Sequence, residues 1–367
     1  YNYSILVRKI VLKKITQFVS CAGWAAKVGL EDLRQITKGL NQPQYNELLV
    51  DFKDNDDCGI IKVGDILLAQ SLDFITPIVD DPFTYGQIAA ANSLSDVFAK
   101  GAKAISAMSI FMWDKTHLNT DEANEILQGA LNKLIECKCP LIGGHSINDS
   151  EQKFGLSVTG RIFDNIYYRN NTAQIGDKII LTKPIGSGIL SSAMKNGKLE
   201  FSKNMDVVKS MLMLNSYAMD FANKFEIHAA SDVTGFGLLG HMLEMINSDI
   251  SINLYLDNIK LFDKVIDFAK SGIIPGGSHK NKSALESRIK NDTNIDDIIY
   301  YDAQTSGGLL IALDYKNANE LNKILNNEGI DSSIIAECIE KREFDIYLRW
   351  LKYSIRFWYL ALSWNKI

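Results

Sequence analysis

"DFITPIVDDPFTYGQIAAANSLSDVFAKG", residues 73–101, decides the fold because it joins the end of a strand to a long helix. The apolar residues that lead into this stretch predict a buried strand that carries Asp73 to the edge of a sheet. The alanine-rich segment after the strand has apolar residues at close to helical spacing, and we expect the helix to end at Gly101. Asn92 and Asp96 lie four residues apart, so their side chains should share one face of the helix.

Strands and helices also alternate on the carboxyl side of this stretch. Residues 121–139 predict an amphipathic helix, and residues 139–147 predict a strand that enters a glycine turn. Farther along, residues 177–188 predict a strand followed by a glycine loop, and residues 211–225 predict a helix. A glycine turn that leads into another helix is expected over residues 232–246. This mixture of elements indicates an α+β protein.

The length of the chain favours two domains. A chain of 367 residues exceeds what one hydrophobic core usually organises, and 46% of the residues are hydrophobic, as in globular proteins. The polar, turn-rich residues 169–177 predict a boundary near Ala173. We therefore expect an amino-terminal domain over residues 16–172 and a carboxy-terminal domain over residues 173–349.

Composition excludes several classes of protein. A net charge of −5 gives no general attraction to phosphate backbones, so nucleic acid is not an expected partner. The apolar run at residues 357–364 is shorter than the roughly 20 residues that a membrane helix needs, and residues 1–14 lack the pattern of a secretion signal. The five cysteines lack zinc-site spacing, which favours reduced thiols and a cytoplasmic location.

Aspartates beside turns are the main chemical signal of the sequence. Any one of them could be a helix cap or a turn residue, but several hard oxygen ligands together suit Mg²⁺ shared with phosphates. The aspartates concerned are Asp54, Asp56, Asp57, Asp73, Asp96 and Asp232. Unobstructed backbone N–H groups at Gly143 and Gly144 could cradle a phosphate, and His145 could donate to it.

Two other nucleotide-binding motifs are disfavoured. The chain contains no G-x-x-x-x-G-K-[ST] pattern, which argues against a Walker-type kinase. "GFGLLG", residues 235–240, matches the dinucleotide pattern G-x-G-x-x-G. However, Asp232 and Thr234 precede it where that motif requires an apolar strand, so the match is weak.

An ordered set of motifs between about Thr16 and Arg349 resembles one family. The motifs are "TQFVSCAGWAAK" (16–27), the opening stretch (73–101), "LIGGHSI" (141–147), "FGLSVTG" (154–160), "TKPIGSGIL" (182–190), "SDVTGFGLLGH" (231–241), "PGG" (275–277) and "DAQTSGGLL" (302–310). Together they resemble selenophosphate synthetases, also called selenide, water dikinases. A collinear set of this kind is far more specific than any single motif.

The resemblance implies a fold and a reaction. The fold would be the two-domain α+β fold of aminoimidazole ribonucleotide synthetase, with amino-terminal sheets paired in a homodimer and ATP bound across the domain interface. The reaction would convert ATP, selenide and water to selenophosphate, AMP and phosphate, supplying selenium for selenocysteine and selenouridine. Two other functions remain open: another small-molecule kinase of the same superfamily, and a nucleotide-binding paralogue without catalysis.

The resemblance also implies site residues. Asp57, Asp96 and Asp232 match the family's Mg²⁺ ligands, and Lys27 matches its essential lysine. The implied nucleotide contacts are Lys27, Asp54, Asn55, Asp56, Asp73, Asp96, Gly143, Gly144 and His145. Only Asp56 matches in side chain within residues 54–56, so its two neighbours would contribute mainly backbone.

Trp24 departs from the family pattern. The family has cysteine or selenocysteine at this catalytic position, and an indole can be neither a nucleophile nor a selenium carrier. We hypothesise that Trp24 marks a UGA selenocysteine codon and that Trp350, where the resemblance ends, marks a UGA stop. Residues 350–367 would then be a read-through tail, and residues 1–15 are expected to be a non-native or flexible extension. Cys21 would then be either a resolving thiol, which forms a reversible bond with selenocysteine at position 24, or merely a small apolar residue.

Overall fold

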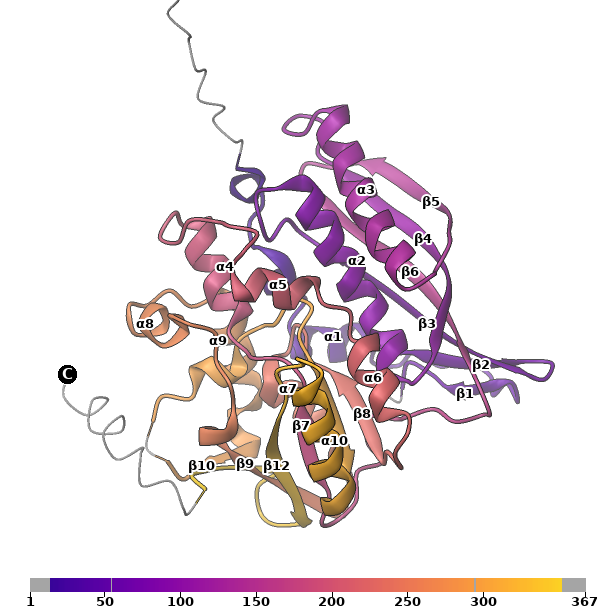
Figure 1. Cartoon of the computed structure of the whole chain (residues 1–367), viewed down its shortest axis with the longest axis vertical. Coiled ribbons are helices and arrows are strands. Elements are labelled where there is room, and N and C mark those ends of the chain that lie inside the picture. The colour runs from indigo at the N-terminus through magenta and orange to yellow at the C-terminus, as the bar shows by residue number, and fades with distance from the viewer. Residues whose placement is uncertain (1–13, 54, 294, 352–367) are drawn as a thin grey trace, which may run out of the picture.

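Two β-sheets, one from each half of the chain, organise the computed structural model (Figure 1). The structure describes residues 14–53, 55–293 and 295–351. The amino-terminal sheet has the strand order β1-β2-β3-β6-β4-β5, and the carboxy-terminal sheet has the order β10-β13-β9-β12-β7-β11-β8. The chain passes between the sheets over residues 163–177, where the predicted boundary near Ala173 lies.

The amino-terminal sheet is antiparallel except for its β4–β5 pair, which is parallel. Its strands are β1 Leu48–Val50, β2 Gly59–Val63, β3 Ile66–Ile75, β4 Lys103–Trp113, β5 Leu141–Asn148 and β6 Lys153–Ile162. β3 contains Asp73 two residues before its end, as the opening stretch predicts. β5 continues through the glycines where the sequence predicted a turn, because residues 143–148 pair with β4. That turn prediction is wrong.

Helices α2 (Pro82–Ala99) and α3 (Thr120–Glu136) cover one face of this sheet (Figure 1). The Asp81 side chain caps α2 by accepting a hydrogen bond from Thr84 N at 2.8 Å. The helix ends before Gly101, whose φ of +72° suits glycine. Both helices therefore confirm the predicted segments.

The opposite face of the amino-terminal sheet carries exposed apolar side chains. We call this surface the outer face and define it by Leu72 and Phe74 on β3, Met108 on β4 and Ile147 on β5. They are 39–56% exposed, whereas inward-facing apolar residues of β3 and β4, such as Ala69 and Ala107, are buried. Large apolar patches are uncommon on monomers, so this face has the character of an interaction surface.

The carboxy-terminal sheet is wrapped by shorter helices. Its strands are β7 Lys178–Leu181, β8 Ala229–Asp232, β9 Ile250–Tyr255, β10 Ile289–Asn291, β11 Leu309–Leu313, β12 Ser333–Glu340 and β13 Ile346–Arg349. The helices of this half are α4 Ser187–Lys195, α5 Asp206–Leu212, α6 Ser216–Ala222, α7 Gly237–Glu244, α8 Val265–Lys270, α9 Gly276–Leu285 and α10 Tyr315–Asn327. The predicted strand and glycine loop at residues 177–188 and the predicted glycine turn into α7 are both present.

The predicted single helix over residues 211–225 is wrong, because the chain forms α5 and α6 with a turn between them. The turn contains Asn215, whose side-chain amide donates to Ser95 Oγ at 2.8 Å and to Gly307 O at 2.9 Å. These contacts hold the turn against α2 and the segment that leads into β11. A local periodicity cannot reveal contacts made to residues so far away in the chain.

The amino-terminal segment places residue 24 at the interface between the two halves of the chain. It contains short 3₁₀-helices at Ile15–Phe18 and Gly23–Ala26, followed by α1 (Leu30–Thr37). Thr16 N donates to Asp80 Oδ1 at 3.0 Å, and Lys195 Nζ donates to the carbonyl oxygen of Ser20 at 2.6 Å. Both halves of the chain therefore hold this segment in place.

The remaining predictions about the whole chain concern its cysteines, its ends and membranes. All five cysteines are free thiols. Residues 1–13 and 352–367, which cover most of the expected extension and tail, lie outside the described residues. Trp350 is half-buried and packs against the main hydrophobic core. In the described part of the chain, no helix combines the length and apolar character needed to cross a membrane.

Candidate functional site

A cavity of about 680 Å³ lies between the two halves of the chain. Most of the predicted site residues line it, and they come from the amino-terminal segment, the β1–β2 connection, β3, α2 and the end of β8. The predicted residues in its wall are Trp24, Lys27, Asn55, Asp56, Asp57, Asp73, Asp96 and Asp232. The structure therefore gathers in one cavity side chains that lie as much as 208 positions apart in the sequence.

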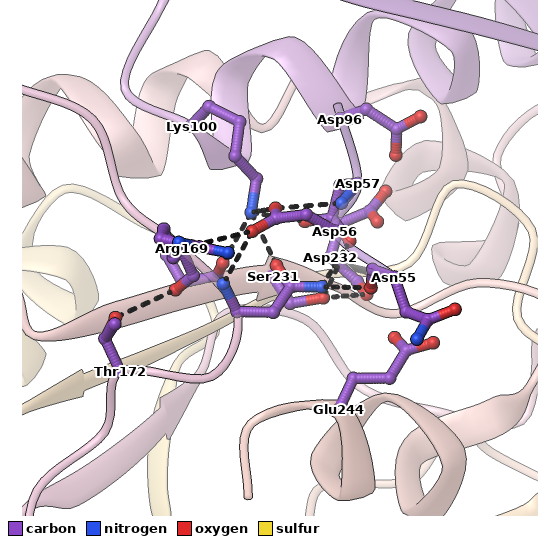
Figure 2. A network of polar contacts seen from close by, with 12 residues as sticks. Asn55, Asp56, Asp57, Asp96, Lys100, Arg169, Thr172, Ser231, Asp232 and Glu244 are labelled. Carbon is purple, nitrogen blue, oxygen red and sulfur yellow. Dashed lines mark hydrogen bonds and ion pairs between the residues drawn. The ribbon is translucent and has the colours of Figure 1, made fainter. Parts of the chain in front are cut away.

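Three of these aspartates form a compact carboxylate triad. One oxygen from each of Asp57, Asp96 and Asp232 lies within 4.8 Å of the other two. Asp57 precedes β2, Asp96 lies in the last turn of α2 and Asp232 ends β8, so three separate elements meet here (Figure 2). Three carboxylates at this spacing are a donor set for a hard divalent cation.

Hydroxyl groups fix the orientation of each carboxylate. Ser71 Oγ donates to Asp96 Oδ2, and Ser95 Oγ donates to Asp232 Oδ2 at 2.5 Å. Ser231 Oγ donates to Asp57 Oδ1 at 3.1 Å. These bonds restrict the rotamers of the three carboxylates before any ligand binds.

Lys100 anchors the loop that carries Asp57. Its ammonium nitrogen lies 2.5 Å from Asp56 Oδ1 and 3.0 Å from Asp57 Oδ2, and it donates to the carbonyl oxygen of Ala230 at 3.0 Å (Figure 2). The side chain is fully buried. Burial lowers the pKa of Lys100, but the carboxylates of Asp57 and Asp56 outweigh it and raise that pKa overall. The lysine is therefore charged and holds two buried carboxylates in position.

The triad concentrates negative charge that a cation would neutralise. Burial raises the pKa of Asp96 well above its usual value, and the nearby carboxylates of Asp73 and Asp232 raise it further. Burial likewise raises the pKa of Asp232, with a further rise from Asp57. Asp57 Oδ2 is buried and accepts no hydrogen bond. The donor set therefore fits a divalent cation. Such a cation would reduce the repulsion between the carboxylates and would give Asp57 Oδ2 a partner.

Asp73 belongs to a hydrogen-bond chain that reaches residue 24. Asn92 Nδ2 donates to Asp73 Oδ2 at 2.9 Å, and Asn92 Oδ1 accepts from Trp24 Nε1 at 2.7 Å and from Ser306 N at 2.9 Å. Burial raises the pKa of Asp73 to about 7, even though Lys27 lowers it. The buried Asn92 therefore couples the side chain at position 24 to a carboxyl group in the cavity wall.

Lys27 lies between two aromatic rings at one end of the cavity. Its Nζ is 4.5 Å from the ring centre of Trp24 and 4.1 Å from that of Phe236. Two glycines make this arrangement possible. Gly23 has a φ of +55°, and a Cβ on Gly235 would lie 2.5 Å from Lys27 Cδ. The glycines in these two motifs therefore allow the close approach of the lysine segment.

Three of the predicted nucleotide contacts lie elsewhere, and one lies outside the described residues. Gly143, Gly144 and His145 are exposed on β5, at the edge of the amino-terminal sheet, and do not line the cavity. Asp54 lies outside the described residues. Asn55, beside it, lines the cavity with a φ of +51°.

Several residues that position the site were not predicted from the sequence. Lys100, the residue directly after α2, follows Asn92 and Asp96 at the same spacing of four. The three side chains therefore lie along one side of this helix, and their regular spacing was a usable signal. Asn170 donates to Asp57 Oδ1 at 3.1 Å but sits in the turn-rich connection between the halves. Nothing local distinguished it from an ordinary turn residue.

Comparison with known proteins agrees with this geometry. The model of the AIR synthase related protein N-terminal domain matches residues 55–162, and that of the corresponding C-terminal domain matches residues 174–349. The crystal structure of thiamine monophosphate kinase from Aquifex aeolicus has a TM-score of 0.60 at 14% identity, covering 87% of this chain and 96% of that chain. At this identity the likeness shows the fold, which is the predicted two-domain fold.

Two sequence relatives are much closer. The selenide, water dikinase of Aliarcobacter butzleri is 43% identical, over 89% of this chain and 96% of the relative. The selenide, water dikinase of Campylobacter jejuni, serotype O:2, is 42% identical, over 92% of this chain and 98% of the relative. With both domain matches and near-complete coverage, the chain belongs to the selenide, water dikinase family.

Proposed function

We propose that the protein makes selenophosphate from ATP, selenide and water, and releases AMP and phosphate. Its relatives of about 40% identity carry the name of this activity. The observation that carries the proposal is the carboxylate triad of Asp57, Asp96 and Asp232, which shares one cavity with Lys27 and residue 24. Such a cavity can hold a polyphosphate, its counter-cation and a small anionic acceptor together. The product would supply selenium for selenocysteine and selenouridine.

Each group in the cavity has a role in this proposal. The triad would hold Mg²⁺, which would neutralise charge that builds on phosphate oxygens as the phosphoanhydride bonds break. Lys27 adds a positive charge that attracts phosphate or selenide anions. Asp73, held by Asn92, faces the nucleotide from β3, and residues 55–56 approach it from the loop before β2.

Residue 24 decides whether this chain is active. The indole of Trp24 donates a hydrogen bond to Asn92 and cannot act as a nucleophile. This well-bonded indole supports a second candidate function, a nucleotide-binding paralogue without catalysis. If the natural residue is selenocysteine, its selenol would lie beside Lys27, whose charge favours the reactive anion.

The test measures AMP formation from ATP with and without selenide. We expect Trp24→Cys to form AMP in a selenide-dependent manner, and the Trp24 protein to form little or none. Asp232→Asn in the Trp24→Cys background should abolish turnover. Equal rates for the Trp24 protein and its Trp24→Cys variant would contradict the role of residue 24 as a nucleophile. Mass spectrometry of the natural protein's peptide 15–27 would identify the residue itself.

The proposed enzyme is a homodimer of the reducing cytoplasm. Free thiols at all five cysteines support that compartment. The exposed apolar outer face supports pairing of two amino-terminal sheets. His145 projects from this face on β5, in register with Ile110 of β4, and Gly143 is in register with Met108. Leu72 of the outer face also lines the cavity, so pairing of the outer faces would bring residues 143–145 toward the cavity of the partner. This pairing would account for the absence of these predicted nucleotide contacts from the cavity of their own chain.

A further inference from the structure

A second cluster of candidate metal ligands adjoins the carboxylate triad. One ligand atom from each of Asp57, His241 and Glu244 lies within 4.8 Å of the other two, and all three side chains line the cavity. Figure 2 shows Glu244 pointing from α7 toward Asn55 and Asp232. The two clusters share Asp57. Neither His241 nor Glu244 has a part in the function proposed above.

The local geometry of α7 suits a cation between its two ligands. His241 and Glu244 are three residues apart and therefore lie on one face of the helix. His241 Nδ1 is 2.9 Å from Glu244 Oε2. Neighbouring ligands of an octahedral cation with bonds of roughly 2.1 Å are about 3 Å apart, so these two atoms already have the required spacing.

The other ring nitrogen of His241 has a partner that allows ligation. His241 Nε2 lies 3.1 Å from Thr234 Oγ1, and a hydroxyl can either donate or accept a hydrogen bond. When Nε2 carries the proton and donates to Thr234, Nδ1 has a free lone pair for a cation. A hydrogen bond on the distal nitrogen is the usual support of a metal-bound histidine.

Asp57 provides an independent observation at this place. Its side chain is only 5% exposed, and its Oδ2 is buried without a hydrogen-bond donor, although the Lys100 ammonium lies 3.0 Å away. Its Oδ1 accepts from Asn170 and Ser231. One oxygen of a buried carboxylate is therefore fully satisfied, and the other still has acceptor capacity that a cation could use.

We propose that Asp57, His241 and Glu244 form a second divalent-cation site that binds first-row transition cations such as Mn²⁺, with Asp57 shared between the two sites. An imidazole ligand favours such cations over Mg²⁺, which prefers oxygen alone. The sharing of Asp57 rests on the function proposed for the triad. Two cations bridged by one carboxylate form an arrangement that can clamp a reacting phosphoryl group from two sides.

The test counts Mn²⁺ bound to the purified full-length protein by electron paramagnetic resonance, with Mn²⁺ as the only added metal. We expect about two ions per wild-type chain. His241→Ala and the more conservative Glu244→Gln should each lose one ion, and Asp232→Asn should lose the other. Asp57→Asn should weaken both. The matched control is His279→Ala, an exposed histidine on α9, which should keep both ions.

A spectroscopic signature separates this proposal from a structural role of His241. Nitrogen modulation of the bound Mn²⁺ signal should be present in the wild type and absent in His241→Ala. Both ions retained in His241→Ala and Glu244→Gln would overturn the second site while leaving the triad intact. Loss of an ion in these two variants but not in Asp232→Asn would support the second site and count against the triad instead.

Discussion

Lys100 shows how one buried residue positions the site. A lysine is rarely fully buried unless it is paired, and here two carboxylates and a backbone carbonyl provide the pairing. The resemblance of the sequence predicted Asp57 and Asp96 as metal ligands, and the structure brings both into the carboxylate triad. The function of Lys100 could not, because its partners Asp56 and Asp57 lie more than 40 positions away and the pairing exists only in the folded chain.

Replacement of Lys100 should therefore destabilise the protein strongly. We expect Lys100→Met to lower the free energy of unfolding by about 3–5 kcal/mol, because it leaves buried carboxylates without their counter-charge. Chemical denaturation with urea measures this change. Lys103→Met, at an exposed position just after α2, is the matched control and should change stability by less than about 0.5 kcal/mol. Similar stabilities for the two variants would show that Asp56 and Asp57 do not depend on Lys100.

At the scale of elements, two glycines set the distance between α2 and α3. A Cβ on Gly86 would lie 1.9 Å from Ile126 O, and a Cβ on Gly129 would lie 2.0 Å from Phe83 O. The helix periodicity in the sequence predicted both helices correctly. It could not predict their close contact, because a helical glycine costs stability by itself and its benefit comes only from the partner helix.

The close contact of α2 and α3 predicts the effect of a single methyl group. Gly129→Ala should destabilise the protein by roughly 1–3 kcal/mol, because the helices must move apart despite the better helix propensity of alanine. Differential scanning calorimetry of the variant measures the shift in Tm. Gly276→Ala, at a position where a Cβ meets no atom within 4 Å, should leave Tm nearly unchanged. An unchanged Tm for Gly129→Ala would mean that the helices are not in this close contact.

A buried carboxyl joins α4 to α9 in the carboxy-terminal half. Asp302 Oδ2 accepts from Ile189 N at 3.1 Å, and Asp302 Oδ1 accepts from Ser278 Oγ at 3.0 Å. Burial raises the pKa of Asp302 to about 7, despite these hydrogen bonds. The "DAQTSGGLL" motif was recognised in the sequence, but its aspartate had no assigned role there. The structure gives it a structural one, as the link between two helices.

The raised pKa of Asp302 predicts how stability varies with pH. The folded state holds this proton up to about pH 7, whereas the unfolded chain releases it near its ordinary pKa of 3.8. Stability from Asp302 is therefore greatest at low pH and is lost as pH rises through about 7. Urea unfolding at pH 5, 6, 7 and 8 should show the stability advantage of wild type over Asp302→Asn shrinking as pH rises. A constant difference would contradict the raised pKa, because other titrating groups cancel in the comparison.

At the scale of the molecule, most of the site residues predicted from the sequence line the cavity, but the sequence could not place residues 143–145. Gly143 and His145 lie on the outer face near its β5 edge, whereas Gly144 between them is in register with Ser109 on the opposite face. No sequence pattern states which face of a strand would meet another subunit. The parallel register with β4 aligns His145 with Ile110, on the face that also carries Met108. The pairing of two copies proposed above would bury the exposed apolar residues of this face.

Disruption of the outer face should therefore separate the subunits. Met108→Glu places a charge at a position that is 47% exposed, so the variant should fold normally. The added carboxylate should nevertheless oppose burial of the outer face against a second copy. We expect wild type to have the mass of a dimer by light scattering at micromolar concentration, and Met108→Glu to have that of a monomer. Lys62→Glu, on the exposed strand β2, is a control that should remain dimeric. A monomeric wild type would contradict pairing of the sheets.

A mixing experiment tests whether His145 serves the partner's cavity. In the Trp24→Cys background, His145→Ala and Asp232→Asn should each be nearly inactive as homodimers. Each mixed dimer then contains one cavity with an intact Asp232 and a native His145 supplied by the partner. Unfolding and refolding the two variants together should restore about a quarter of the parental rate of AMP formation, because half of the dimers are mixed and each has one complete site. No recovery, with mixed dimers verified by mass spectrometry, would show that His145 does not act across the interface.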